Sequence, residues 1–241
     1  SAMMNEPILT ESEKIEIILR NYDEMDNEIM ALNTIFYLHA SKNSMKVNFL
    51  LAQAYDSLNK PFMTAGDTRR GLAQKSAICY ELAFLDAERV KLPLSDIDSS
   101  NFFCQVDIAL SLGRVLVENP SIRDLEKAEV FLNFAFNNIV YYTHDLYFLA
   151  DLYYKQSRYL KSIDIISQLE KRLIEYKIED WRPKWELEKL LVKNYRKLVS
   201  ESKKYKNLEE ALMYSEKLIH CKYHSANDKV VYNKLQKAVN T

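Results

Sequence analysis

Glycine and proline are scarce in this sequence. Its 241 residues include three glycines and five prolines, where average usage would give roughly seventeen glycines and twelve prolines. The glycines, Gly66, Gly71 and Gly113, form no Asn-Gly or Asp-Gly hairpin turn and no glycine-rich phosphate-binding loop. This scarcity argues against β-sandwiches, β-barrels, dinucleotide-binding folds and P-loop enzymes.

Cysteine and net charge are low as well. Cys79, Cys104 and Cys221 are odd in number and widely spaced, which is typical of a reducing compartment such as the cytosol or the nucleus. Lys and Arg total 33 against 34 Asp and Glu, a formal net charge of −1, so we expect neither nucleic acid nor an anionic membrane as a partner. No apolar run reaches the length of about eighteen residues that a membrane-spanning helix needs, and no signal peptide is evident.

Apolar residues recur at helical spacing along most of the chain, which predicts an all-α fold. Proline steps and polar runs separate about eleven antiparallel helices, stacked as helical hairpins in an array with a concave groove. Two of these helices flank a break near residues 21–23. The others are expected at about 44–60, 68–91, 101–119, 124–140, 145–156, 159–176, 184–201, 208–220 and 227–239.

The predicted helices divide the chain into three parts. Residues 1–10, which begin with an apparent cloning scar, are expected to be disordered, and residues 11–203 form the main helical domain. Residues 204–241 form an additional helical extension packed on the same array. An amphipathic extension of this kind either lengthens the array or lies in the groove and occludes it, and lengthening is our working hypothesis.

Two segments resemble the tetratricopeptide consensus, in which small residues let the two helices of a hairpin approach closely. The first has large, aromatic and small residues at the family's positions: Leu146, Leu149, Ala150, Tyr153, Tyr159, Ser162, Ile166 and Leu169. The second, with a three-residue insertion in its turn, comprises Leu112, Gly113, Leu125, Ala128, Leu132 and Ala135. The remaining hairpins do not keep the 34-residue period of that family, so an irregular array is expected.

The order of several short motifs also resembles that of 14-3-3 proteins. Residues 21–25 are similar to that family's Arg-Tyr-Asp-Asp-Met, and residues 50–55 to its Leu-Leu-Ser-Val-Ala-Tyr. Farther along, residues 114–118 are similar to its Arg-Tyr-Leu-Ala-Glu and residues 190–194 to its Leu-Leu-Arg-Asp-Asn. The resemblance implies a nine-helix adaptor that binds phosphoserine or phosphothreonine peptides in a groove and forms a homodimer through its first helices.

The positions of the phosphate pocket in that family are only partly retained. Its lysine corresponds to Asp56, its arginine on the fifth helix to Arg114, and its tyrosine to Val115. Arg69 and Arg70, on the connector after the third helix, could supply the missing cation. Because phosphate affinity rests on several charge-assisted hydrogen bonds acting together, this set predicts an atypical and weakened phosphate pocket.

The ninth helix supplies the remaining candidates for peptide binding. Asn194 aligns with an asparagine that hydrogen-bonds peptide main chain in 14-3-3 proteins, and it lies on one stripe with Leu187, Leu191 and Leu198. The alternative is that Asn194 satisfies a neighbouring helix inside the core. Arg114 has an alternative as well, since Glu118 lies four residues on and an ion pair at that spacing is ordinary.

Metal and catalytic signatures are weak. The run from His220 to His224 contains three potential zinc ligands, two histidines and Cys221, but it lacks a fourth. No nucleophile has a recognisable base and orienting partner, so we expect neither an enzyme nor a cofactor. The hypothesis is a non-enzymatic adaptor that binds phosphorylated or other peptide segments of partner proteins. The alternative is a tetratricopeptide-type scaffold subunit of a larger complex.

Overall fold

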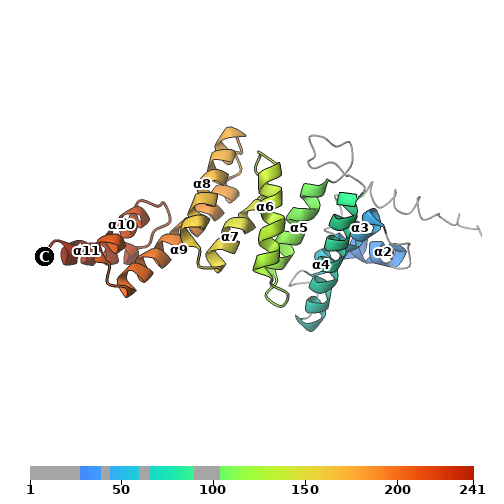
Figure 1. Ribbon diagram of the computed structural model, residues 1–241, viewed down its shortest axis with the longest axis horizontal. Helices are drawn as coiled ribbons and strands as arrows, with labels where there is room; N and C mark the ends of the chain where they lie inside the picture. The colour runs from blue at the N-terminus through green and yellow to red at the C-terminus, as the bar shows by residue number, and fades with distance from the viewer. Residues whose placement is uncertain (1–27, 39–43, 60–65, 90–103) are drawn as a thin grey trace, which may run out of the picture. The chain divides into compact units, whose positions relative to one another are not determined.

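The computed structural model describes residues 28–38, 44–59, 66–89 and 104–241. These ranges contain ten α-helices and one short 3-10 helix and no strand, which confirms the all-α prediction (Figure 1). The elements are α2 (Glu28–Leu38), α3 (Met45–Leu58), α4 (Gly66–Arg89), α5 (Gln105–Glu118), α6 (Leu125–Asn138), η3 (His144–Leu146), α7 (Tyr147–Lys155), α8 (Tyr159–Glu175), α9 (Trp181–Lys204), α10 (Leu208–Ile219) and α11 (Ala226–Val239).

Some sequence predictions fall outside these ranges. They concern residues 1–10, the first expected helix, the break near residues 21–23, and the connectors 60–65 and 90–103. The homodimer implied by the 14-3-3 resemblance depends on the first of these segments. It therefore stays a prediction.

Helix α9 is longer at both ends than the sequence pattern predicts. It begins at Trp181 rather than at residue 184, because the Asp180 side chain accepts a hydrogen bond from the Arg182 amide and caps the helix at 3.1 Å. Pro183 then falls in the first turn, where its missing amide proton costs no intrahelical hydrogen bond. The helix ends at Lys204 rather than at residue 201.

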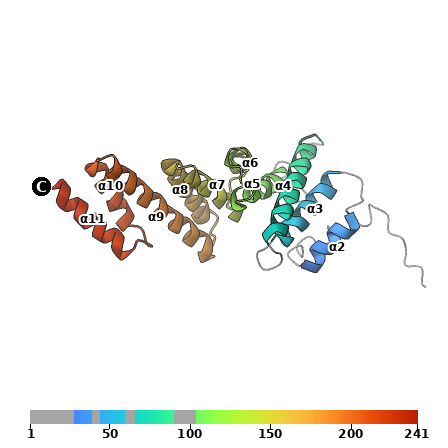
Figure 2. The same ribbon diagram turned by 90° about the horizontal axis from the view of Figure 1, so that it is seen from below.

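The chain separates into two compact units, Ser1–Ile139 and Val140–Thr241. We call them the first unit and the second unit. The division expected at residue 203 instead lies inside the second unit, where α10 packs against α9 and α11 packs against α10 (Figure 2). Residues 208–239 therefore continue the stack of helices that begins with α7.

In the first unit, consecutive helices from α2 to α6 pack against each other. The Ser76 hydroxyl of α4 donates a 2.9 Å hydrogen bond to the Ala52 carbonyl of α3. A Cβ atom at Gly113 would lie 2.4 Å from Leu132 Cγ, so the close approach of α5 and α6 requires glycine at this position.

Three helices share one pattern of buried positions. Counted from the first residue of α6, α8 and α10, the fourth, eighth and eleventh residues are all buried. The fourth residue is small in each case, which allows the preceding helix to pack closely. The residues are Ala128, Leu132 and Ala135 in α6, Ser162, Ile166 and Leu169 in α8, and Ala211, Ser215 and Leu218 in α10.

Helices α7, α8 and α9 end in the same way. After each one, a residue with positive φ turns the chain: Ser157 at 60°, Lys177 at 51° and Lys206 at 58°. The amide that follows donates a hydrogen bond to the carbonyl five residues back, at 2.8, 3.0 and 2.9 Å respectively. These are Schellman motifs, and they stop each helix sharply although no glycine occupies the left-handed position.

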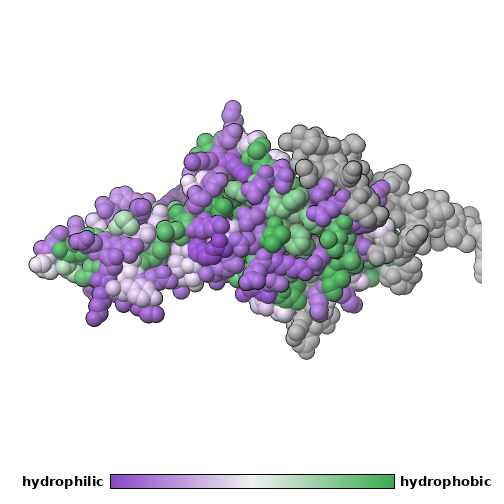
Figure 3. All heavy atoms as spheres, in the orientation of Figure 1, coloured by the Kyte–Doolittle hydropathy of each residue, from purple (hydrophilic) through white to green (hydrophobic). Residues whose placement is uncertain are grey.

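Apolar side chains remain on the surface in small groups. The face drawn in Figure 3 shows green apolar residues interspersed with purple polar ones. Among the more exposed apolar residues are Ile78 in α4, Ile174 in α8, Trp181 in α9 and Met213 in α10. Within the ranges described, none of the helices is both long enough and apolar enough to cross a bilayer.

Candidate functional site

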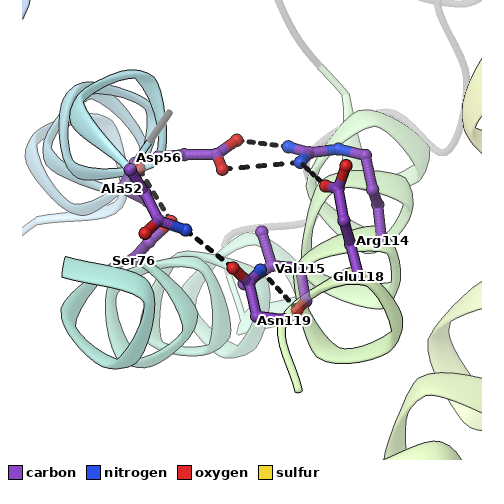
Figure 4. Close-up of polar contacts among 8 residues, drawn as sticks. Ala52, Asp56, Ser76, Arg114, Val115, Glu118 and Asn119 are labelled. Carbon is purple, nitrogen blue, oxygen red and sulfur yellow. Dashed lines mark hydrogen bonds and ion pairs between the residues drawn. The ribbon is translucent and has the colours of Figure 1, made fainter. Parts of the chain in front are cut away.

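Arg114 lies between two carboxylates in the first unit. Its guanidinium donates hydrogen bonds to both carboxylate oxygens of Asp56 on α3, and Nη1 also donates to Glu118 Oε2 at 3.0 Å (Figure 4). The Arg114 and Asp56 side chains are each 19% exposed. Asp56 and Glu118 both pair with this one cation, so the three side chains carry a formal net charge of −1.

A second hydrogen-bonded layer fixes the same junction of α3 and α5. The side-chain amide of Asn59 donates to Asn119 Oδ1 at 2.7 Å. The side-chain amide of Asn119 donates in turn to the Val115 carbonyl at 2.8 Å (Figure 4). The Val115 side chain is buried. The junction is therefore built by contacts within the protein, and a phosphate would have to compete with two carboxylates for Arg114.

The other two candidate cations cannot be added to this cluster. Arg69 and Arg70 lie in the first turn and a half of α4, which begins at Gly66. Their side chains are outside the part of the chain that the structure describes. Their contribution to an anion site stays a prediction.

Asn194 is fully buried in the second unit and does not face a groove. Its amide donates to Ser162 Oγ at 2.9 Å and to the Leu190 carbonyl at 3.0 Å. The Ser162 hydroxyl in turn donates to the Ala150 carbonyl at 2.8 Å. This chain of hydrogen bonds links α9, α8 and α7, so the structure favours the alternative that Asn194 satisfies neighbouring helices in the core.

The leucines of the predicted peptide-binding stripe are divided between the core and the surface. Leu187 and Leu198 are buried in the core together with Asn194, so they are not surface contacts for a peptide. Leu191 is half-buried. The stripe fails as a single surface because Leu187, Asn194 and Leu198 lie on the core side of α9, and Leu191 lies at the edge of that side.

Leu191 contributes to an open hollow of about 790 Å³ in the second unit. Its apolar wall consists of Leu191 and Tyr195 from α9 and Met213 from α10. Leu191 and Tyr195 are half-buried, and Met213 is 43% exposed. We call this depression the α8–α10 hollow, because residues from α8, α9 and α10 line it.

Carboxylates line the same hollow. Glu170 comes from α8, Glu188 from α9 and Glu216 from α10. Glu170 is half-buried and the Glu188 side chain is 18% exposed, whereas Glu216 is exposed. Burial, reinforced by the negative charge of Glu188 and opposed by Lys184, raises the pKa of the Glu170 carboxyl group above its usual value.

Cations in the hollow lie at its solvent edge. Lys217 and Lys222 line it and are both exposed. Lys184, which is 67% exposed, reaches Glu188 from outside, with 3.8 Å between Nζ and Oε1. This contact is long and its lysine end is exposed, so it offsets little of the carboxylate charge, and the partly buried charges of the hollow, Glu170 and Glu188, are both negative.

The potential zinc ligands of the sequence do not converge. His220 Nδ1 lies 2.7 Å from the Glu216 carbonyl, and His224 Nδ1 lies 2.7 Å from the Cys221 carbonyl. In the described ranges, no group of three or more His, Cys, Asp and Glu side chains is arranged to hold a metal ion. Burial, with the nearby charges of Glu170 and Glu188, raises the pKa of the Cys221 thiol to about 11.

Sequence reasoning identified Leu191 as a binding residue and named His220 and Cys221 only as potential zinc ligands, and it missed the carboxylates and the rest of the apolar wall. Tyr195, Met213, Glu170 and Glu188 belong to three different helices, and no motif joins them. The equal spacing of buried residues in α8 and α10 could have indicated that these two helices take equivalent places beside α9. It could not have indicated a hollow.

The chain matches no protein-family model, and no curated protein matches it significantly in sequence. The resemblances to 14-3-3 proteins and to tetratricopeptide repeats thus depend on the short motifs alone. They remain hypotheses.

Proposed function

We propose that this protein is a non-enzymatic helical adaptor that binds segments of partner proteins, and that binding does not require a phosphate group. The observation that carries the proposal is the α8–α10 hollow. Its apolar wall of Leu191, Tyr195 and Met213 is accessible, concave and large enough for several side chains of a peptide. Tyrosine and other large side chains of this kind are enriched in protein interfaces.

The independence from phosphate is supported by the Arg114 cluster. Arg114 is held by Asp56 and Glu118, and the net negative charge of the three side chains opposes a phosphate dianion. A phosphate would gain hydrogen bonds from one guanidinium and would displace two carboxylates from it. This exchange is unfavourable unless other cations join.

The raised pKa values of the cysteines argue against one class of enzyme, that with a cysteine nucleophile. Burial, with the charge of Asp107, raises the pKa of the Cys104 thiol to about 12, and burial with nearby carboxylates raises that of Cys221 to about 11. Thiols with such pKa values are protonated at neutral pH and are poor nucleophiles. Burial raises the pKa of the Cys79 thiol as well.

A scaffold subunit without a segment-binding site is the second candidate. It is favoured by the buried pattern shared by α6, α8 and α10, because such repeats stack into extended structural arrays. The two candidates differ in one respect: the adaptor must bind a short peptide in the hollow, and the scaffold need not.

The test is selection from a random-peptide display library on the full-length chain, followed by fluorescence polarisation. We expect selected peptides whose binding is weakened by Met213→Asn roughly tenfold or more, equal to about 1.4 kcal/mol, because a neutral polar side chain interrupts the apolar wall without adding charge. Met213→Leu should retain binding because it conserves the apolar wall. The matched control is Val230→Asn on α11, where an apolar residue of similar exposure lies outside the hollow.

The phosphate requirement is tested separately with a phosphoserine peptide carrying an upstream arginine and with its unphosphorylated twin. We expect no difference between the two peptides and no effect of Arg114→Ala. Tight binding that needs the phosphate and is abolished by Arg114→Ala would restore the phosphopeptide adaptor. Selected peptides that bind equally well to Met213→Asn would favour the scaffold.

A further inference from the structure

The α8–α10 hollow combines two features that a cationic side chain needs. Leu191, Tyr195 and Met213 form an apolar wall, against which a methylene chain can pack. Glu170 and Glu188 line the same hollow from neighbouring helices, both are partly buried, and their charges act on each other. Among the described residues, no hydrogen bond or ion pair engages the Glu170 side chain.

The lysines of the hollow do not neutralise these two carboxylates. Lys217 and Lys222 are exposed to solvent, and Lys184 makes only a 3.8 Å contact with Glu188. Burial raises the pKa of the Cys221 thiol and the charges of Glu170 and Glu188 add to this rise, so the thiol lies in the field of both carboxylates. An incoming cation would relieve the repulsion between the carboxylates, and an incoming anion would increase it.

We propose that the hollow receives a lysine or arginine side chain from a segment of a partner protein. The stem of that side chain lies along Leu191, Tyr195 and Met213, and its charged head lies between Glu170 and Glu188. Charge complementarity selects this occupant, because partly buried carboxylates gain most from a charge-assisted hydrogen bond. The inference rests on the proposed adaptor function and adds the chemistry of the residue that is recognised.

The experiment uses peptides selected on the full-length chain from a random-peptide library. We expect each peptide that is sensitive to Met213→Asn to contain at least one lysine or arginine whose replacement by norleucine weakens binding. The double variant Glu170→Gln with Glu188→Gln should weaken the parent peptides roughly ten- to hundredfold, as expected for the loss of hydrogen bonds to charged groups. The amides conserve shape, and thermal unfolding of the variant verifies its fold.

The matched control is Glu201→Gln, which removes an exposed carboxylate of α9 outside the hollow and should leave affinity unchanged. Peptides that need Met213 but lack basic residues, or that bind the double Gln variant as well as wild type, would overturn this inference and leave the adaptor function standing. Peptides insensitive to Met213→Asn would overturn both. Loss of affinity with the double variant and not with Glu201→Gln supports the inference.

Discussion

The Arg114 cluster of the first unit and the α8–α10 hollow of the second unit each bring together charged side chains from different helices. In the Arg114 cluster, one guanidinium is hydrogen-bonded to two carboxylates. In the hollow, two partly buried carboxylates lie near each other and the lysines stay at the solvent edge. A charged group that already has its partners stabilises the fold, whereas a crowded one gains from a ligand.

The largest expected loss of stability comes from removing the cation of the Arg114 cluster. Arg114→Ala leaves Asp56 and Glu118 without their shared cation, and both Arg114 and Asp56 are mostly buried. We expect local stability to fall by about 1–3 kcal/mol. Hydrogen exchange measured by mass spectrometry should show lower protection of α3 and α5.

The control for Arg114 is Arg182→Ala in the second unit. Arg182 pairs with Asp180 at 2.9 Å, but its side chain is 70% exposed, so its loss should change stability much less than the loss of Arg114. Equal effects of the two substitutions would mean that Asp56 and Glu118 do not depend on Arg114 for their stability.

A somewhat smaller loss of stability is expected from substituting Asp228, a carboxylate of the second unit that has its own hydrogen-bond donors. The Asp228 carboxylate accepts hydrogen bonds from Arg196 at 2.8–3.2 Å and from the Ser225 amide at 2.7 Å. These contacts attach the start of α11 to α9. We expect Asp228→Asn to lower the local stability of α11 by about 1–2 kcal/mol, as seen by hydrogen exchange.

The same carboxylate predicts a pH dependence. Burial acts to raise the pKa of Asp228, but hydrogen bonds from Arg196 and Ser225 outweigh it and the net pKa is lowered. A lowered carboxyl pKa in the folded state means that the stabilisation is present above the ordinary value of about 3.9 and is lost as the pH falls through the folded value. Protection of α11 should therefore decrease below about pH 4, and Asp228→Asn should remove that decrease.

The comparison is sharpened by replacing a carboxylate with its amide in both the Arg114 cluster and the α8–α10 hollow. Asp56→Asn should lower the melting temperature because it removes a partner of Arg114. Glu170→Gln should raise it, because the raised pKa of Glu170 means that its ionised form costs stability at neutral pH. Both changes should amount to less than about 1 kcal/mol. Two shifts of the same sign would contradict the distinction between paired and crowded carboxylates.

The raised pKa of Glu170 also predicts how the effect of Glu170→Gln on the melting temperature depends on pH. Because folding raises its pKa, the cost is present at neutral pH and disappears as the pH falls through the folded value. The melting temperatures of wild type and Glu170→Gln should therefore converge as the solution is acidified. A constant difference between them would point to packing and not to charge.

The smallest expected change in stability comes from substituting Lys177, which lies in the second unit but outside the hollow. Lys177 has a φ of 51° in the Schellman motif after α8, a conformation that glycine adopts at lower cost. Lys177→Gly should raise stability by a few tenths to about 1 kcal/mol and leave peptide affinity unchanged. Lys171→Gly, at an exposed position inside α8, should lower stability by about 1 kcal/mol.

The helices were largely predictable from the sequence because each one has its own apolar periodicity and its own end signals. Ser44, Asp124 and Asn207 cap their helices with side chains that accept backbone hydrogen bonds. The start of α9 was missed because Pro183 was interpreted as the boundary, although a proline fits the first turn. The division into two units was missed as well, since no composition change marks Ile139.

The candidate site was predictable only in part. The sequence indicated correctly that Asp56 and Arg114 belong to one place, and the structure adds that they neutralise each other. The side of α9 that faces the core could not be decided from Leu187, Leu191, Asn194 and Leu198, because a helix in a stack has neighbours on more than one side. Only the packed structure assigned Asn194 to the core.

By itself, the sequence determined that the chain is helical and where most helices begin and end, because these depend on residues within one or two turns of each other. The tertiary structure decided which charges are satisfied, because Arg114 meets Asp56 across 58 residues and Glu170 meets Glu188 only when α8 packs on α9. Interactions between distant residues depend on where the backbone brings them. That placement is a property of the folded chain.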